Sequence, residues 1–361
     1  MRKIVVLVLI LLVNRSITYS QGCVAIRGTG SVCTLQHPNS MKGWQLNSSY
    51  RYFKSFRHFV GKEEQEERVK QKTEVINWQH TLDFTVVRNL DNRWSFGLYV
   101  PILANTRSSL YEHGGNSGGP AARHSTHSFG LGDIRFTVYR WLLDQAKNMK
   151  GNVQVGLGIK LPTGSYNYQD FFIKNDSTKI LGPVDQSIQL GDGGTGIAFE
   201  VNGFHVFSHV ISAYGNFYYL INPREQNGTS TARGGTPSAS AVAYGSSVMS
   251  VPDQFLLRAG VNVSLKDLVF SAGVRDECLP SRDLIGGNNG FRRPGYIISF
   301  EPGISYNFKK FSAYATVPVA LERNRTQSEP DRLRTKATGN YTHGDAAFAD
   351  YTINIGFSVK L

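Results

Sequence analysis

The sequence has little charge, three cysteines and one long apolar run. Charged residues make up 18% of its 361 residues, whereas soluble proteins carry roughly a quarter. The apolar run, Ile4 to Val13, follows Arg2 and Lys3 and is too short to cross a bilayer as a helix. No later stretch resembles a membrane helix, so any membrane span must be built from strands.

The short apolar run and its basic flank are typical of a signal peptide. We expect cleavage after Ser20, so that residues 1–20 form the export signal. Gly22-Cys23 leaves lipoprotein processing at Cys23 open, although the leucine usual in a lipobox is missing. Residues 21–43 are expected either to enter the barrel as a plug or to form a disordered periplasmic tail.

Cysteine is too scarce to form a disulfide framework. Cys23 and Cys33 are close together, so one local disulfide in an oxidising compartment is the simplest assignment for them, while Cys278 stands far away. Neither the cysteine spacing nor the nearby histidines give a closed set of metal ligands. We therefore predict no metal and no cofactor. The net charge is +12, but no block of Lys and Arg predicts nucleic-acid binding.

Stretches that alternate between apolar and polar residues recur along the chain and predict strands. Twelve are expected, at 44–55, 75–87, 94–103, 129–141, 153–162, 195–203, 210–222, 255–265, 268–276, 296–308, 311–320 and 348–361. Short connections such as 266–267 alternate with long ones such as 163–194. This is the arrangement of outer-membrane barrels, with short periplasmic turns and long extracellular loops. The predicted fold is an all-β, transmembrane, antiparallel up-and-down barrel over residues 44–361, in the outer membrane of a Gram-negative bacterium.

One face of each predicted strand is apolar and suits lipid, and the other is polar and suits a lumen. In the fifth strand, Val153, Val155 and Leu157 share the apolar face. The charged residues expected in the lumen carry both signs: Arg51, Asp83, Asp133, Arg135, Lys160, Glu200, Arg258, Arg275, Glu301 and Asp350. They are expected either to pair across the barrel and brace the wall or to line a polar conduit. Neither sign dominates enough to predict ion selectivity.

Three glycine-rich segments carry a family resemblance. They are GLGDI from Gly130, GLGIKLPTGSY from Gly156 and LGDGGTG from Leu190. Their order and spacing resemble the outer-membrane barrels named for the MetA pathway of phenol degradation, which are allied to the long-chain fatty-acid and toluene channels. The likeness covers residues 130–203 and otherwise rests on shared architecture. It implies passive passage of small, often hydrophobic or aromatic molecules, and it leaves the cargo open.

A lipid-modifying hydrolase and an adhesion protein are the alternatives to a channel. A lipid-modifying hydrolase would need a nucleophile and a base near the rim, and His124 and Ser125 are candidates without an evident orienting group. An adhesion protein would use the long loops, among which 225–252 predicts a flexible, hydrated segment and 62–74 a solvated loop or short helix. We predict a channel and no enzyme. The oligomeric state is left open.

The last strand carries an assembly motif. Asn354, Gly356, Val359 and Leu361 match the spacing of the C-terminal signal of outer-membrane barrels, which implies recognition by the barrel-assembly machinery. The expected surroundings are outer-membrane lipid and lipopolysaccharide. The last strand must also pair with the first, near Trp44, because an unpaired edge is not tolerated in lipid.

Overall fold

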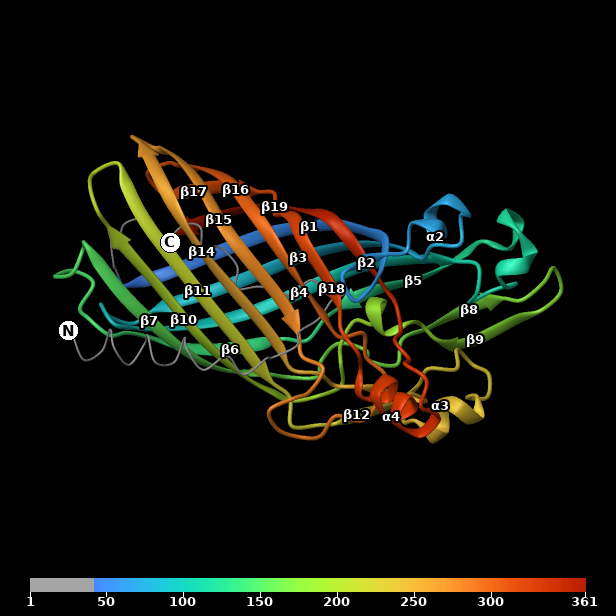
Figure 1. Ribbon diagram of the computed structural model, residues 1–361. Coiled ribbons are helices and arrows are strands. Elements are labelled where there is room, and N and C mark those ends of the chain that lie inside the picture. The colour runs from blue at the N-terminus through green and yellow to red at the C-terminus, as the bar shows by residue number, and fades with distance from the viewer. Residues whose placement is uncertain (1–41) are drawn as a thin grey trace.

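The computed structural model describes residues 42–361, and its ribbon is a tilted cylinder of strands with folded loops at one end (Figure 1). The expected signal peptide, the plug or tail, and the Cys23–Cys33 pair lie outside the described residues. No helix within 42–361 is long and apolar enough to cross a membrane.

Long strands form the cylinder. They are β1 (Gly43–Val60), β3 (Ile76–Asn89), β4 (Trp94–Ser109), β5 (His124–Leu131), β6 (Arg135–Trp141), β7 (Gly151–Lys160), β10 (Gly196–Val206), β11 (Ile211–Ile221), β14 (Gln254–Leu265), β15 (Leu268–Leu279), β16 (Gly295–Asn307), β17 (Phe311–Thr316), β18 (Val319–Arg325) and β19 (Ala346–Lys360).

Shorter elements lie in the loops. They are β2 (Glu63–Glu64), α2 (Glu66–Lys70), η2 (Asn116–Gly118), η3 (Pro120–Ala122), β8 (Gln169–Ile173), β9 (Lys179–Pro183), η4 (Gln186–Ile188), β12 (Gln226–Ser230), α3 (Ala239–Ala243), β13 (Val248–Ser250) and α4 (Glu329–Thr338).

The sheet closes on itself. Each strand pairs antiparallel with its neighbours, and β1 pairs with β19 from Gln45↔Lys360 to Phe59↔Ala346. Because β5 and β6 share one wall position, as do β17 and β18, the barrel has twelve strands, as predicted. Closure leaves no long edge of unpaired backbone facing lipid.

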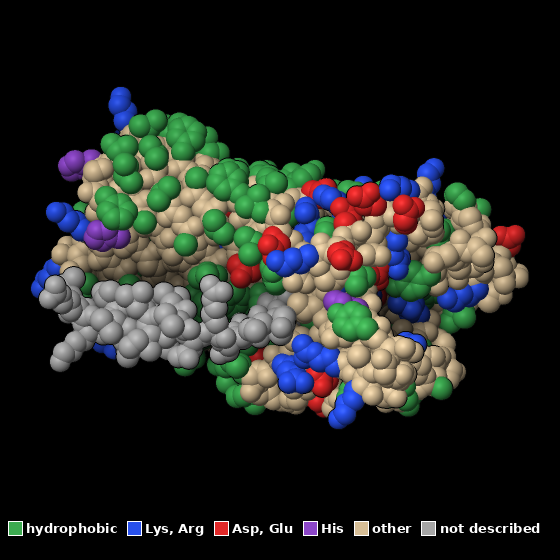
Figure 2. Space-filling view, viewed as in Figure 1, with side chains coloured by type: hydrophobic (Ala, Val, Ile, Leu, Met, Phe, Trp, Pro, Cys, Tyr) green, Lys and Arg blue, Asp and Glu red, His purple; other side chains and the backbone are tan. Residues whose placement is uncertain are grey.

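Apolar side chains lie on the outside of the barrel and polar side chains on the inside, which is the reverse of their distribution in a soluble protein. Large apolar side chains are exposed on the outward face, including Leu82, Phe84, Leu98, Leu157, Ile197, Phe199, Phe270, Phe300, Ile304 and Phe357. Polar and charged ones are buried on the inward face, including Asn47, Gln79, Thr81, Asn202 and Asn216. Figure 2 shows the apolar side chains gathered over the barrel wall and the charged ones over the loops. An apolar band of this kind is what lipid tails require.

Two of the predicted strands are broken, at different places and for different reasons. The segment 129–141 splits at Gly132-Asp133-Ile134 into β5 and β6, where these three residues oppose two of β4, Val100 and Pro101. The extra residue is a bulge, and it moves the inward face from Thr126 and Ser128 to Arg135 and Thr137. The segment 311–320 splits at Pro318, which has no N–H to give to a ladder.

The long loops are folded and do not extend freely into solvent. The segment 225–252, expected to be flexible, contains β12 and β13 paired from Gln226↔Ser250 to Ser230↔Val248 and the short helix α3. The segment 62–74, expected to be a solvated loop or a short helix, contains the short helix α2. Ser328 begins α4 with a capping box formed with Asp331, and Gly339 ends it. Together these loops cover the extracellular end of the barrel.

Candidate functional site: the lumen and its inward loop

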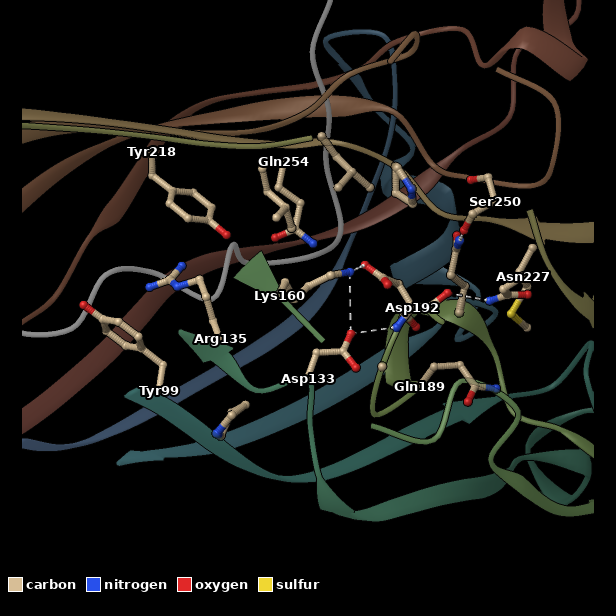
Figure 3. Close-up of a pocket in the computed structure, with 18 of the residues that line it drawn as sticks. Tyr99, Asp133, Arg135, Lys160, Gln189, Asp192, Tyr218, Asn227, Ser250 and Gln254 are labelled. Atoms are coloured by element: carbon tan, nitrogen blue, oxygen red, sulfur yellow. Dashed lines mark hydrogen bonds and ion pairs between the residues drawn. The ribbon is translucent and has the colours of Figure 1, made fainter. Parts of the chain in front are cut away.

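A cavity of about 110 Å³ lies in the lumen beneath the loops. Its walls come from the inward faces of β3, β4, β6, β7 and β11 and from the loop between β7 and β10. The lining side chains include Tyr99, Asp133, Arg135, Lys160, Gln189, Asp192 and Tyr218 (Figure 3). We call this space the lumen cavity. Of the predicted lumen residues, Asp83, Asp133, Arg135 and Lys160 line it.

The segment from Val184 to Leu190 runs inside the barrel. Both of its end residues and Ile188 between them are almost fully buried. The side-chain amide of Gln79 on β3 donates to the backbone oxygen of Ser187 (2.8 Å), and the hydroxyl of Ser128 on β5 donates to that of Ile188. We call residues 184–190, which include η4, the inward loop. It lies against the inner wall and narrows the passage.

The three glycine-rich segments of the family resemblance meet at one carboxylate. Asp133 accepts hydrogen bonds from the backbone N–H groups of Gly164 (3.0 Å) and Asp192 (3.1 Å). Lys160 binds Asp192 and lies 3.7 Å from Asp133. These contacts join the β5–β6 bulge to both ends of the loop between β7 and β10, so they hold the inward loop in place.

The glycines of these segments permit the close approach. A Cβ atom on Gly164 would lie 2.6 Å from the carbonyl oxygen of Leu190, and one on Gly191 would lie 2.5 Å from the Asp133 carboxylate. Either contact would force the segments apart. The hydroxyl of Thr163 also donates to Gly132 O (2.8 Å) and accepts from Ile134 N (2.8 Å), which satisfies backbone groups freed by the bulge.

An arginine that lines the lumen cavity is flanked by two aromatic rings. The guanidinium of Arg135 on β6 lies 4.2 Å from the ring centre of Tyr99 and 4.9 Å from that of Tyr218, which stands on β11 beyond β7 and β10. Arg135 also pairs with Glu200 (3.2 Å), which accepts from the Tyr139 hydroxyl (2.9 Å). The cation–π and ionic contacts together link β4, β6, β10 and β11 on the lumen side of the wall. Figure 3 shows Arg135 between the two rings.

Other predicted lumen residues pair on the far wall. Arg258 binds Glu301 through two parallel hydrogen bonds (2.8 and 2.9 Å). Arg275 binds Glu277 (2.8 Å) and lies 3.7 Å from Glu301. Arg51 is buried on the inward face of β1. These pairs have the geometry of braces, because each guanidinium bridges carboxylates of its own or a nearby strand.

Asp350 lies at a seam of the wall. Beyond the single pair Val319↔Tyr351, no ladder joins β18 to β19. Instead Arg323 donates to the carbonyl oxygen of Ala349 (3.0 Å) and to the Asp350 carboxylate (2.6 Å), which Arg57 of β1 also binds (2.8 Å). Asp350 thus closes the seam and does not line the lumen cavity.

Three features of the site were not anticipated from the sequence. They are the inward position of residues 184–190, the stacking of Tyr99 and Tyr218 on Arg135, and the role of Asp192. Asp192 lies within the LGDGG segment, and Tyr99 and Tyr218 stand at inward positions of the strand pattern, so the signals were present. The sequence does not show which residues Asp192, Tyr99 and Tyr218 contact.

The residues weighed for hydrolysis do not form a catalytic pair. His124 and Ser125 are consecutive in β5, so their side chains point to opposite faces of the sheet. His124 packs against the ring of His113, with ring centres 5.5 Å apart. Within 42–361, no three His, Cys, Asp or Glu side chains are grouped as metal ligands would be. Cys278 is a buried free thiol.

The closed twelve-stranded barrel with an apolar outer face defines an outer-membrane β-barrel. No protein-family model matches the sequence. The fold is similar to that of an outer-membrane channel from Pseudomonas putida F1, with a TM-score of 0.58 at 9% identity over 91% of this chain and 100% of that chain.

Two further solved structures show weaker likenesses. The toluene transporter TbuX of Ralstonia pickettii gives a TM-score of 0.41 at 8% identity, over 89% of this chain and 90% of that one. A FadL homologue of Pseudomonas aeruginosa gives 0.40 at 8% identity, over 88% and 90%.

Proposed function

We propose that the protein is an outer-membrane channel through which small molecules with apolar or aromatic surface pass without an energy source. The observation that carries this is the lumen cavity. Its wall contains apolar surface from Tyr99, Pro101, Tyr218, Leu220 and Met249 beside charged groups. Such a mixture suits a small ligand with an apolar body and few polar groups. The neighbour from Pseudomonas putida F1, described as an outer-membrane channel, supports the same function.

A cargo that passes through the lumen cavity meets Arg135, which lines it. The cation–π contacts of Arg135 are noncovalent and individually worth about 0.5–2 kcal/mol, so an aromatic cargo can replace a tyrosine ring on the guanidinium at little cost. This exchange favours aromatic molecules over sugars of similar size, which have no π face. The channel therefore discriminates by the surface of the cargo as well as by its size.

The experiment is uptake by proteoliposomes. Purified full-length protein is reconstituted, and entry of phenol is compared with that of glycerol, a neutral polar molecule. We expect phenol entry to exceed the protein-free background more than glycerol entry does. Tyr218→Leu removes the stacking ring but keeps apolar volume, so it should reduce the preference for phenol, whereas Tyr306→Leu at an exposed, outward position should not. Equal entry of both solutes, or none, would refute the proposal.

The remaining expectations follow from the same fold. The barrel should reside in the outer membrane, contact lipid and lipopolysaccharide, and be inserted by the barrel-assembly machinery. A heat-dependent shift of gel mobility in the outer-membrane fraction tests residence there. Recovery of the folded protein from the soluble periplasm would contradict it.

A further inference from the structure

A second, larger cavity lies among the extracellular loops. Its volume is about 550 Å³, within the roughly 300–1,000 Å³ of small-molecule sites. The extracellular ends of β1, β3, β4 and β19, the helix α4 and the segment Phe291 to Arg293 surround it. Ser187 of the inward loop lines both this cavity and the lumen cavity. We call it the outer cavity, and the inward loop forms the partition between the two.

Arginines dominate the charged lining of the outer cavity. They are Arg68, Arg107, Arg233, Arg292, Arg293, Arg325 and Arg334, and the acidic residues in the same lining are Asp331 and Asp345. Three arginines have a carboxylate each: Arg292 binds Asp283 (2.6 Å), Arg325 binds Asp331 (3.1 Å), and Arg68 binds Asp345 (2.7 Å).

The other four arginines have too few counter-ions. Arg107 and Arg233 both bind Glu112 (3.0 and 2.9 Å), and Asp185 binds Arg293 (2.7 Å) with Arg107 at 3.4 Å and Arg233 at 3.8 Å. Two carboxylates thus serve three guanidinium groups. Arg334, exposed on α4, makes no ion pair with any residue from 42 to 361. Within the described part of the chain, five carboxylates thus pair with the seven arginines of the outer cavity, which leaves a surplus of two positive charges.

Both shared carboxylates are ionised at neutral pH. Burial raises the pKa of Asp185, but the charges of Arg107 and Arg293 outweigh burial and hold it well below its usual value. The pKa of Glu112 is lowered by the same balance between burial and the charges of Arg107 and Arg233. No proton transfer within the cluster can remove its negative charges, and arginine does not deprotonate in proteins. The surplus of positive charge is a fixed property of the cavity.

The cavity also offers aromatic surface beside the guanidinium groups. Tyr111, Tyr244 and Phe291 line it. Arg233 lies 5.1 Å from the ring centre of Tyr111, and Arg293 lies 4.8 Å from that of Phe291. A guanidinium held on a ring can still bind a carboxylate through two hydrogen bonds of its N–H edge, as Arg293 binds Asp185 (2.7 Å each).

We propose that the outer cavity binds a small organic anion, of the class of aromatic carboxylates, before it reaches the lumen. The carboxylate supplies the missing counter-charge, and the ring packs against Tyr111, Tyr244 or Phe291. This proposal adds a substrate class to the proposed channel function. Passage of the anion through the barrel rests on that function, whereas its binding in the outer cavity does not.

The test is calorimetric binding of benzoate to the folded full-length protein in detergent, with benzyl alcohol and acetate as comparison ligands. Benzoate should bind more tightly than both, because benzyl alcohol lacks the charge and acetate lacks the ring. Arg334→Gln should weaken benzoate binding about threefold to tenfold at low salt, as expected for one charge in a partly hydrated site. Binding should also weaken as sodium chloride is raised.

Lys336→Gln is the matched control. It removes the same charge from the same helix, two residues on, at an exposed position outside the cavity lining. It should leave benzoate binding within twofold of the wild type. Arg233→Gln, checked for folding by its heat-dependent gel shift, should weaken binding about tenfold or more because this arginine lies in the charge-imbalanced cluster.

The outcomes separate this inference from the proposed channel. Benzoate binding that is equal to that of benzyl alcohol, or unchanged in both arginine variants, overturns the inference, whether or not phenol enters liposomes. Weakened benzoate binding in Arg334→Gln with normal entry of phenol supports it. Failure of phenol entry with intact, arginine-dependent benzoate binding would refute the channel for neutral aromatics and keep the anion site.

Discussion

Asp133→Ala should release the inward loop. The Asp133 carboxylate accepts two backbone hydrogen bonds, from Gly164 (3.0 Å) and Asp192 (3.1 Å), and it lies 3.7 Å from the ammonium group of Lys160. In the alanine variant both N–H groups lose this acceptor. Lys160 keeps Asp192 as a partner, so the ionic contact is only partly lost.

The size of the effect follows from these contacts. A hydrogen bond to a charged acceptor contributes about 1.5–3 kcal/mol, and water reaching the freed N–H groups would recover part of the loss for two such bonds. A net loss of about 3 kcal/mol for the docked loop is expected on this basis. Because 1.4 kcal/mol corresponds to a factor of ten, the undocked fraction should rise roughly a hundredfold. Asp133→Asn, which keeps one acceptor oxygen, should have a smaller effect.

Single-channel recording in planar bilayers measures the change. Asp133→Ala should show larger or more frequent conductance steps than the wild type, because the undocked loop leaves the lumen wider. Asp91→Ala is the control, since Asp91 also accepts two backbone hydrogen bonds, from Arg93 (2.7 Å) and Trp94 (2.8 Å), but in the turn between β3 and β4. If Asp133→Ala and Asp91→Ala conduct alike, the inward loop is not held by Asp133 and the reasoning fails.

Three further predictions concern stability and assembly. Arg258→Ala should lower the free energy of unfolding by about 3–5 kcal/mol, because the buried Glu301 then keeps a hydrogen bond with Thr316 but its nearest guanidinium is that of Arg275, 3.7 Å away. An unchanged urea midpoint would contradict this. Adding Glu301→Gln should restore part of the loss. For Asp345, burial raises the pKa, but the hydrogen bond from His58 and the charge of Arg68 bring it to about 2, below the value of about 3.9 in an unfolded chain. The carboxylate therefore stabilises the fold above pH 4, and this contribution should be lost between about pH 4 and pH 2. Over that interval the thermal unfolding midpoint of the wild type should fall more steeply than the midpoint of Asp345→Asn. Deleting Val359 to Leu361 removes the pairs Leu46↔Val359 and Phe311↔Val359 and should abolish membrane assembly. Deleting Asn175 to Ser177 in the exposed β8–β9 turn should leave assembly intact. Normal membrane levels of the first deletion would contradict this prediction.

The barrel could be predicted because its physical signal is repeated. Each wall strand must present apolar residues to lipid and polar residues to the lumen, so the alternation in 153–162 recurs, with variations, in eleven other segments. The lengths of the connections added an independent signal. The strand 311–320 was less well predicted, because Pro318 interrupts its ladder and because its pairing with β19 stops at Val319↔Tyr351, which depends on a partner far along the chain.

The lumen was less predictable, since its contacts join residues far apart in the sequence. Alternation places Arg135 and Glu200 on inward faces, but no local pattern reveals that Arg135 lies between two tyrosine rings. The same holds for Asp350, whose partners Arg57 and Arg323 come from other strands. Charge balance in the lumen suggested bracing, and the structure shows which pairs carry it.

The glycine-rich segments explain why the resemblance indicates architecture more than cargo. Asp133, Gly164 and Gly191 hold the inward loop against the β5–β6 bulge, and a side chain at either glycine would clash. These residues hold the loop in this barrel, whatever passes beside it. Cargo choice should instead depend on groups that the resemblance does not include: Tyr99 and Tyr218 in the lumen and the arginines of the outer cavity. Substitutions at these side chains should change which molecules pass, whereas substitutions in the glycine-rich segments should change how widely the channel opens.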